Sequence, residues 1–257
     1  MKVQVNEVFG PTFQGESGEV GWPCFFLRLH QCPVKCSFCD TSYTWSGSET
    51  HKYKWSGDDL RFWFDGWYND NPGCGLVVSG GEPLIHYNNI EFIEFIEYVR
   101  SKTWVTVETS SFSGPKPIST CGSDHITNFE RFTRAFTVVN CSPKLTNALA
   151  TPEWTHEQLS QNIPLLMRSL DPVLSSHNTR LAFKLVVNGQ ADIDIVCGLN
   201  DKYQWQKQGF SIYLMPFGNT PSEIIKQIDQ LVPTLAKTGF LLSPRLHSIV
   251  WGNVREK

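Results

Sequence analysis

Short apolar runs separated by helical patterns constrain the fold of this chain more than any other feature. The runs are rich in aliphatic, β-branched and aromatic side chains, and few of them alternate strictly with polar residues. Near-continuous apolar runs favour the strands of a parallel sheet, because helices then cover the sheet on both faces. We therefore expect strands at residues 24–29, 75–78, 104–107, 136–139, 181–187, 211–214 and 247–251.

Helical patterns lie between these runs. Residues 89–100 carry apolar side chains at helical spacing behind an asparagine cap, and a Thr-Pro pair at 220–221 is typical of a helix start. We expect further helices near 58–67 and 156–170, and we expect Pro233 to kink or shorten the helix that follows residue 221. The alternation of strands and helices predicts an α/β fold with a largely parallel sheet.

We expect a single domain over residues 1–257. No linker divides the chain, but residues 44–73 and 110–128 are rich in Gly, Ser, Pro and Asp and are expected to be insertions. The net charge of −3 argues against nucleic-acid binding, which needs a positive surface. No run of ~18 apolar residues predicts a membrane span, and the first residues lack the apolar stretch of a secretory signal. We therefore expect a cytoplasmic protein.

Three of the eight cysteines are clustered, at Cys32, Cys36 and Cys39. Disulfides are rare in a reducing compartment, so this C-x3-C-x2-C segment indicates a metal centre. A zinc site or a complete cubane normally takes four protein ligands, and no second cysteine pair exists. Three ligands suggest a 4Fe–4S cluster with one iron open to a non-protein ligand. The alternative is a zinc knuckle that uses Cys24 or His30 as the fourth ligand.

A Gly-Gly-Glu-Pro segment at 80–83 ends the next expected strand. Glycines let backbone approach a ligand closely, carbonyl groups and Glu82 can accept hydrogen bonds from an ammonium group, and Pro83 fixes the turn. Alone this would be an ordinary turn. Next to a three-cysteine loop it indicates a cofactor site.

The cysteine spacing, with an aromatic residue before the last cysteine, resembles that of the radical S-adenosylmethionine (SAM) enzymes. Further segments resemble the 7-carboxy-7-deazaguanine synthase family. These segments are residues 7–16, 26–29, 39–45, 107–110, 140–144, 183–187 and 245–247. The resemblance implies a partial (β/α) barrel of the radical SAM type that uses a 4Fe–4S cluster, SAM and Mg²⁺.

The resemblance also implies residue roles. The three clustered cysteines would bind the cluster, and Thr41 would bind Mg²⁺. The implied substrate-binding residues are Phe13, Gln14, Gly15, Glu16, Arg28, Ser79 and His247. The implied SAM-binding residues are Phe38, Asp40, Gly80, Gly81, Glu82, Glu108, Thr109, Ser142, Pro143, Lys144, Met215, Pro216, Phe217 and Gly218. Met215 is a departure, because the family often has Gln there.

The family contracts the ring of 6-carboxy-5,6,7,8-tetrahydropterin, with loss of ammonia, to give 7-carboxy-7-deazaguanine. The resemblance therefore implies a lyase of deazapurine biosynthesis. It also implies an electron donor such as a flavodoxin and a homodimer. The alternatives are a glycyl-radical-enzyme activase, which shares the cysteine loop, and a zinc-binding module without catalysis.

Overall fold

A nine-stranded sheet runs through the computed structural model, which describes residues 2–48, 50–112, 123–145, 148, 162–171, 178–252 and 254–256. The strand order is β3-β1-β2-β4-β5-β6-β7-β8-β9. The strands are β1 (Val3–Phe13), β2 (Pro23–Leu29), β3 (Tyr53–Trp55), β4 (Gly75–Ser79), β5 (Val105–Thr109), β6 (Val138–Cys141), β7 (Arg180–Val187), β8 (Ser211–Pro216) and β9 (Leu241–Leu242). Strand β1 is antiparallel to β2 and β3, and the other pairs are parallel. Because β3 and β9 do not pair with each other, the barrel is partial, as predicted.

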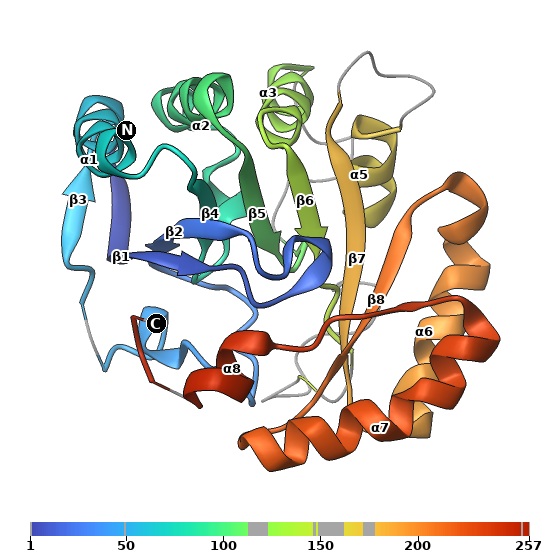
Figure 1. Ribbon diagram of the computed structural model, residues 1–257. Helices are drawn as coiled ribbons and strands as arrows, with labels where there is room; N and C mark the ends of the chain where they lie inside the picture. The colour runs from blue at the N-terminus through green and yellow to red at the C-terminus, as the bar shows by residue number, and fades with distance from the viewer. Residues whose placement is uncertain are drawn as a thin grey trace.

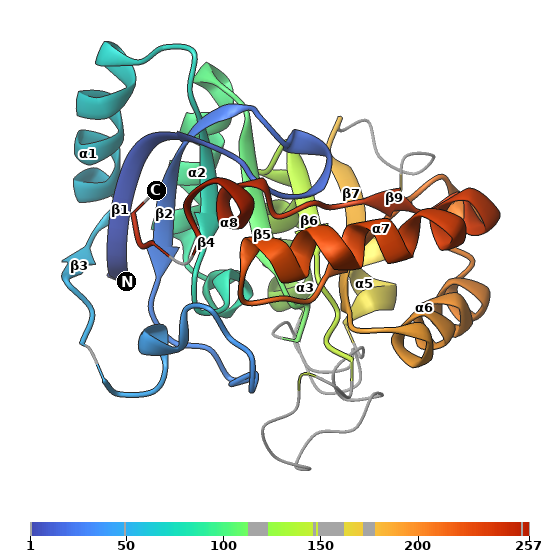
Figure 2. The ribbon, with the colours of Figure 1, turned by 60° about the horizontal axis from the view of Figure 1, so that its bottom comes forward.

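Helices follow most of the parallel strands. They are α1 (Gly57–Asp70), α2 (Ile90–Lys102), α3 (Ser123–Arg134), α5 (Ile163–Ser169), α6 (Gln190–Tyr203), α7 (Pro221–Thr238) and α8 (Leu246–Trp251). Helices α1, α2 and α3 lie on one side of the sheet, and α8 lies on the other side, close to the C-terminus (Figures 1 and 2). Within the described part of the chain, none of the helices combines the length and apolarity needed to cross a bilayer.

Capping residues fix where several helices begin. Ser56 starts α1 with a capping box to Asp59, and Thr220 starts α7 in the same way with Glu223. The Asn89 side chain accepts a hydrogen bond from the Phe92 backbone N–H at the start of α2. Capping residues can be recognised in the sequence. The two helix starts that were predicted from them, at Asn89 and Thr220, are therefore confirmed.

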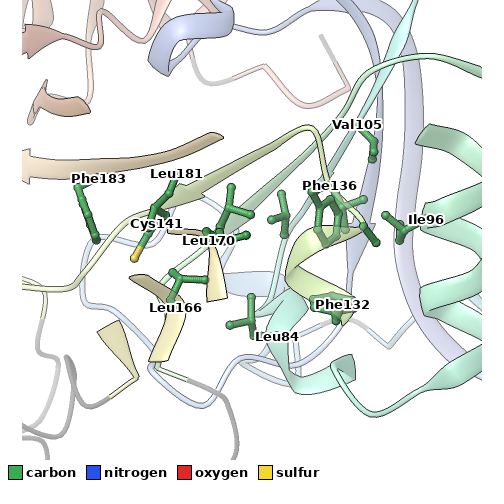
Figure 3. Close-up of a cluster of buried hydrophobic side chains, with 14 of the residues drawn as sticks. Leu84, Ile96, Val105, Phe132, Phe136, Cys141, Leu166, Leu170, Leu181 and Phe183 are labelled. Atoms are coloured by element: carbon green, nitrogen blue, oxygen red, sulfur yellow. The ribbon is translucent and has the colours of Figure 1, made fainter. Parts of the chain in front are cut away.

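The two faces of the parallel strands differ in character. Side chains on one face join the main apolar core under the helices, and Phe132, Leu166 and Leu181 belong to this core cluster (Figure 3). Side chains at the alternate positions point to the other face, and several of these are polar: Arg28, Ser79, Glu108, Asn140 and Lys184. Successive side chains of a strand point to opposite faces of the sheet, so one face joins the apolar core and the other face carries the polar residues.

Two local predictions need correction, and a third is confirmed over the described part of its range. The run 247–251, predicted as a strand, forms helix α8, where Val250 is 53% exposed; an apolar run this short does not distinguish the two structures. Pro233 does not shorten α7, which continues to Thr238. The helix predicted near 156–170 is described only from Ile163, where Pro164 occupies its first turn rather than ending it.

The two predicted insertions have different outcomes. Residues 44–73 contain β3 and α1, which cover the antiparallel edge of the sheet. Of residues 110–128, 113–122 lie outside the described residues, and α3 begins at Ser123.

Candidate functional site

The three clustered cysteines follow the carboxyl end of β2 and line one cavity of about 760 Å³. They pack with Val34 and Ala148 in a small apolar cluster. The Cys39 Sγ accepts a hydrogen bond from Trp45 Nε1 at 3.4 Å and lies 3.5 Å from Thr41 Oγ1. The loop thus brings three sulfur donors to a single opening.

The donor set of this loop fits an iron–sulfur cluster. Burial raises the pKa of the Cys32 thiol to about 12, assisted by the charge of Glu82, and burial also raises the pKa of Cys36. In the described residues no three His, Cys, Asp or Glu side chains are arranged to hold a bare metal ion. Binding would require loss of the thiol protons, because the thiolate is the form that binds a metal. Soft sulfur donors without competing nitrogen or carboxylate ligands suit iron–sulfur chemistry.

The Gly-Gly-Glu-Pro turn is locked against the chain that leads into the cysteine loop. Gly81 has a φ of +46°, and a Cβ there would lie 2.2 Å from the carbonyl oxygen of Gln31. The Glu82 backbone N–H donates to that same carbonyl at 2.8 Å, and the Gly81 N–H donates to Thr44 Oγ1 at 3.3 Å. Only glycine allows this approach, so the turn and the loop hold each other in place.

The Glu82 carboxylate connects this turn to the end of β5. It is 1% exposed and accepts hydrogen bonds from the backbone N–H groups of Leu84 (3.0 Å) and Ser110 (2.8 Å). It also accepts from the hydroxyl groups of Thr109 and Ser110. Glu82 therefore fixes Thr109 at the cavity wall.

Lys184 is the central cation of the polar interior. Its ammonium group donates to the carboxylates of Glu16 and Glu108, and its side chain is 4% exposed. Glu108 also accepts from Gln14 Nε2 and Asn140 Nδ2, each at 3.0 Å. One buried cation therefore links the end of β1 to β5 and β7.

This network controls the charge of both carboxylates. Burial would raise the pKa of Glu16, but the charges of Lys184, His247 and Arg245 outweigh it and hold the pKa at about 2. For Glu108, burial raises the pKa, and this effect is larger than the lowering of the pKa by the charge of Lys184. Burial lowers the pKa of His247, so its imidazole is neutral at pH 7, with Nε2 3.8 Å from Glu16 Oε1.

Aromatic side chains form the apolar part of the cavity wall. Phe13 stacks on Trp251 with ring centroids 4.6 Å apart, and Phe38 packs edge-on against Phe217 at 5.6 Å. Met215 on β8 is 9% exposed and also lines the cavity. A flat heterocycle could therefore lie between apolar walls while the polar row contacts its edges.

Comparison with known proteins agrees with this architecture. A family model described as a 4Fe-4S single cluster domain matches residues 17–139. The chain is 28% identical to a 7-carboxy-7-deazaguanine synthase from Pyrobaculum aerophilum, over 100% of this chain and 98% of that relative. A synthase of the same name from Bacillus subtilis is 23% identical over 98% of both chains. The chain is therefore similar over nearly its whole length to proteins named 7-carboxy-7-deazaguanine synthase.

A solved structure has a similar fold. The crystal structure of QueE from Escherichia coli superimposes with a TM-score of 0.60 and 20% sequence identity, covering 95% of this chain and 93% of that one. The partial barrel with a largely parallel sheet that the sequence predicted is therefore confirmed.

Most of the residues that the sequence predicted for this site line the same cavity. The exceptions are Gly15, Pro143 and Pro216, which lie outside its lining. Gly15 lies directly beneath His247, since a Cβ on it would be 2.2 Å from the imidazole Nδ1. The predicted residues that line the cavity are Phe13, Gln14, Glu16, Arg28, Cys32, Cys36, Phe38, Cys39, Asp40, Thr41, Ser79, Gly80, Gly81, Glu82, Glu108, Thr109, Ser142, Lys144, Met215, Phe217, Gly218 and His247.

Sequence reasoning missed several charged and polar residues of the site. Glu7, Tyr43, Lys184, Arg245 and Arg255 also line the cavity. Lys184 had a readable signal, because it is the one charged residue between Leu181 and Val187. Arg255 had none, because its partner Glu7 lies 248 positions away in the chain.

Proposed function

We propose that this protein is a lyase that contracts the ring of 6-carboxy-5,6,7,8-tetrahydropterin to give 7-carboxy-7-deazaguanine with loss of ammonia. One observation carries the proposal: the three-cysteine loop opens into the cavity lined by the polar row of β2, β4, β5 and β7. The names of the relatives support the same product.

The proposed cofactor site lies around the cysteine loop. Cys32, Cys36 and Cys39 would hold the cluster, and the 80–82 turn with Glu108 and Thr109 would line the SAM site. When bound, the cluster and SAM supply one-electron chemistry that removes a hydrogen atom from the substrate. Phe38 and Phe217 would exclude water from this part of the cavity, and Lys144, whose ammonium donates to Ser142 Oγ at 3.0 Å, would border it.

The proposed substrate site lies between β1, β2 and α8. Arg28 and Ser79 are register neighbours on β2 and β4, so a guanidinium and a hydroxyl group point to the same place. Arg28 would bind the substrate carboxylate. Gln14 is held by its hydrogen bond to Glu108, which orients its amide for a polar ring edge. Neutral His247 can donate or accept a proton at Nε2.

We extend the proposal to five further properties. Thr41, with Asp40 beside it in the chain, would bind Mg²⁺ at the mouth of the cavity, where Arg245 Nη2 lies 3.8 Å from the Asp40 carboxylate. The electron would come from a small donor such as a flavodoxin. The protein would act in the cytoplasm as a homodimer. Each subunit would be one domain.

The direct test is an anaerobic incubation of the cluster-loaded protein with SAM, a reductant, Mg²⁺ and 6-carboxytetrahydropterin. We expect 7-carboxy-7-deazaguanine by mass spectrometry. Its absence from protein that carries a full cluster would refute the proposal. A glycyl radical raised on a partner protein, without turnover of the pterin, would favour the activase.

Metal analysis after anaerobic purification distinguishes the proposed iron–sulfur protein from a zinc-binding module. We expect about four iron atoms and four sulfides per chain. Cys36→Ala should lose the cluster, whereas Cys197→Ala, a matched change on α6 outside the cavity, should keep it. One zinc per chain with no iron would support the non-catalytic module instead.

A further inference from the structure

A buried amide connects the proposed site with the loop between β1 and β2. Asn140 on β6 is fully buried and is the register partner of Glu108 on β5. Its Nδ2 group donates to Glu108 Oε1 and to Glu19 Oε2, each at 3.0 Å. Neither Asn140 nor Glu19 lines the cavity. Asn140 therefore lies behind the cavity wall and uses both of its N–H groups on carboxylates.

The two carboxylates fix the orientation of this amide. Both neighbours of Nδ2 accept hydrogen bonds, so the reverse orientation would place the Asn140 oxygen against two acceptors. As a result, Asn140 Oδ1 is buried without a hydrogen-bond partner among the described residues. A buried acceptor without a donor lowers the stability of a fold. Stability alone therefore does not explain an asparagine at this position.

On the cavity side, Asn140 shares one oxygen of Glu108 with Gln14. Glu108 Oε1 accepts from Gln14 Nε2 at 3.0 Å as well as from Asn140. Gln14 Oε1 in turn accepts from the Gly15 backbone N–H at 2.8 Å, which settles which end of the Gln14 amide faces Glu108. Gln14 and Glu108 both line the cavity. The side chain that would meet the ring edge of the substrate is thus oriented by a carboxylate that Asn140 holds.

On the other side, Asn140 holds the loop that carries Gln14. Glu19 in this loop is 2% exposed, and its second oxygen accepts from Arg180 Nη2 at 3.1 Å. Two backbone hydrogen bonds, each of 2.8 Å, join Gln14 to residues 21–22 and close the loop at its base. Gln14 is therefore connected to Asn140 by two routes, one through its own side chain and one through the loop backbone.

We propose that Asn140 is a positioning residue of the substrate site, which orients Glu108 and thereby the amide of Gln14 against the pterin. This inference rests on the proposed function. Asn140 itself would touch no ligand. A binding group that is already held in its bound conformation loses less conformational entropy when the ligand binds, so loss of the Asn140 N–H groups should weaken binding through Gln14.

The competing explanation is that Asn140 only stabilises the loop. Ser243 provides a control, because its hydroxyl oxygen accepts a hydrogen bond from the Ser17 backbone N–H at 2.9 Å and so holds the same loop. Ser243 is fully buried and does not line the cavity. Ser243→Ala therefore removes an anchor of the loop but keeps the hydrogen bonds of Glu108.

The experiment measures binding of the stable aromatic pterin 6-carboxypterin to the cluster-loaded protein in the presence of SAM. A double-mutant cycle combines Asn140→Leu with Gln14→Met. We expect Asn140→Leu to weaken binding about fivefold or more in the wild-type background, which is the effect of about one hydrogen bond. In the Gln14→Met background it should weaken binding less than about twofold, because the contact that Asn140 orients is already absent.

Two further variants complete the measurement. Ser243→Ala should leave the affinity within about twofold of the wild type. Asn140→Thr, whose hydroxyl can donate to one of the two carboxylates, should give an intermediate loss, and it replaces Asn140→Leu in the cycle if that variant does not fold. Urea unfolding of every variant establishes that binding is measured on folded protein.

The outcomes separate the two proposals. Wild-type protein that does not bind 6-carboxypterin would sink the proposed function and this inference with it. If the wild type binds the pterin and Asn140→Leu binds it equally well, only the role of Asn140 is wrong. Equal weakening by Asn140→Leu in both backgrounds, or the same weakening by Ser243→Ala, would show that Asn140 is a structural anchor of the loop.

Discussion

Replacement of Lys184 by Met should destabilise the protein strongly, because it removes the cation shared by two buried carboxylates. The Lys184 side chain is 4% exposed, and those of Glu16 and Glu108 are 15% exposed. Met keeps most of the length and the apolar volume of the Lys stem, so the change chiefly removes the charge and its hydrogen bonds. The variant therefore isolates the electrostatic contribution of this network.

The magnitude follows from the pKa of Glu16. Lowering that pKa from 4.5 to about 2 corresponds to about 3 kcal/mol, and Lys184 is its largest favourable cause. Removal of one partner of a buried ion pair typically costs about 3–5 kcal/mol. We therefore expect the free energy of unfolding to fall by about 3 kcal/mol at neutral pH. Lys207→Met, at an exposed site in the 206–208 turn, should change it by less than about 0.5 kcal/mol.

The pH dependence gives a second signature. In the wild type the depressed pKa of Glu16 stabilises the fold above pH 4.5, and this contribution is lost as the pH falls toward about 2. In the variant the uncompensated carboxylates have raised pKa values, so the folded state takes up a proton and gains stability as the pH falls. The difference between variant and wild type should therefore shrink as the pH is lowered.

Urea unfolding followed by circular dichroism at several pH values between about 5 and 8 measures both effects. We expect Lys184→Met to lower the free energy of unfolding strongly near pH 8 and less near pH 5. A Lys184→Met protein within about 1 kcal/mol of the wild type at every pH would refute the reasoning.

Two further substitutions test separate parts of the site. Thr41→Ala should weaken the Mg²⁺ dependence of turnover while the iron content stays unchanged; an identical Mg²⁺ titration curve would count against Thr41 as a ligand. Gly81→Ala should lose about 2 kcal/mol or more in thermal or urea unfolding, because its Cβ would meet the Gln31 carbonyl at 2.2 Å and its φ is +46°. Gly198→Ala inside α6, with no atom near its added Cβ, should instead be neutral or stabilising by up to about 1 kcal/mol.

The parallel strands could be predicted from the sequence because their signals are local. Each apolar run is short enough for one strand, and turn or cap residues bound it. The antiparallel β1 was missed as a strand, since polar residues such as Asn6 and Glu7 interrupt it and are buried only through tertiary partners. The strand predicted at residues 247–251 was wrong because five residues rich in apolar side chains can form a helical turn as well as a strand.

The convergence of Cys32, Cys36 and Cys39 on one cavity could be predicted because the three cysteines are close in sequence. The charge network could not be predicted, because its members come from different strands. Lys184 reaches Glu16 across 168 positions and Glu108 across 76. Lys184, like Arg28, is a single cation in an apolar strand, and this pattern could have indicated that Lys184 belongs to the site. Which carboxylates it meets depends on strand order, which only the structure gives.

We propose that ring contraction of a carboxypterin takes place in the cavity of the three cysteines. The most direct test is product formation under anaerobic conditions by wild-type protein and Cys36→Ala, each incubated with iron and sulfide, then given SAM, reductant, Mg²⁺ and 6-carboxytetrahydropterin. We expect 7-carboxy-7-deazaguanine from the wild type and none from the variant. Product from Cys36→Ala at the wild-type rate, or no product from a fully cluster-loaded wild type, would contradict this proposal.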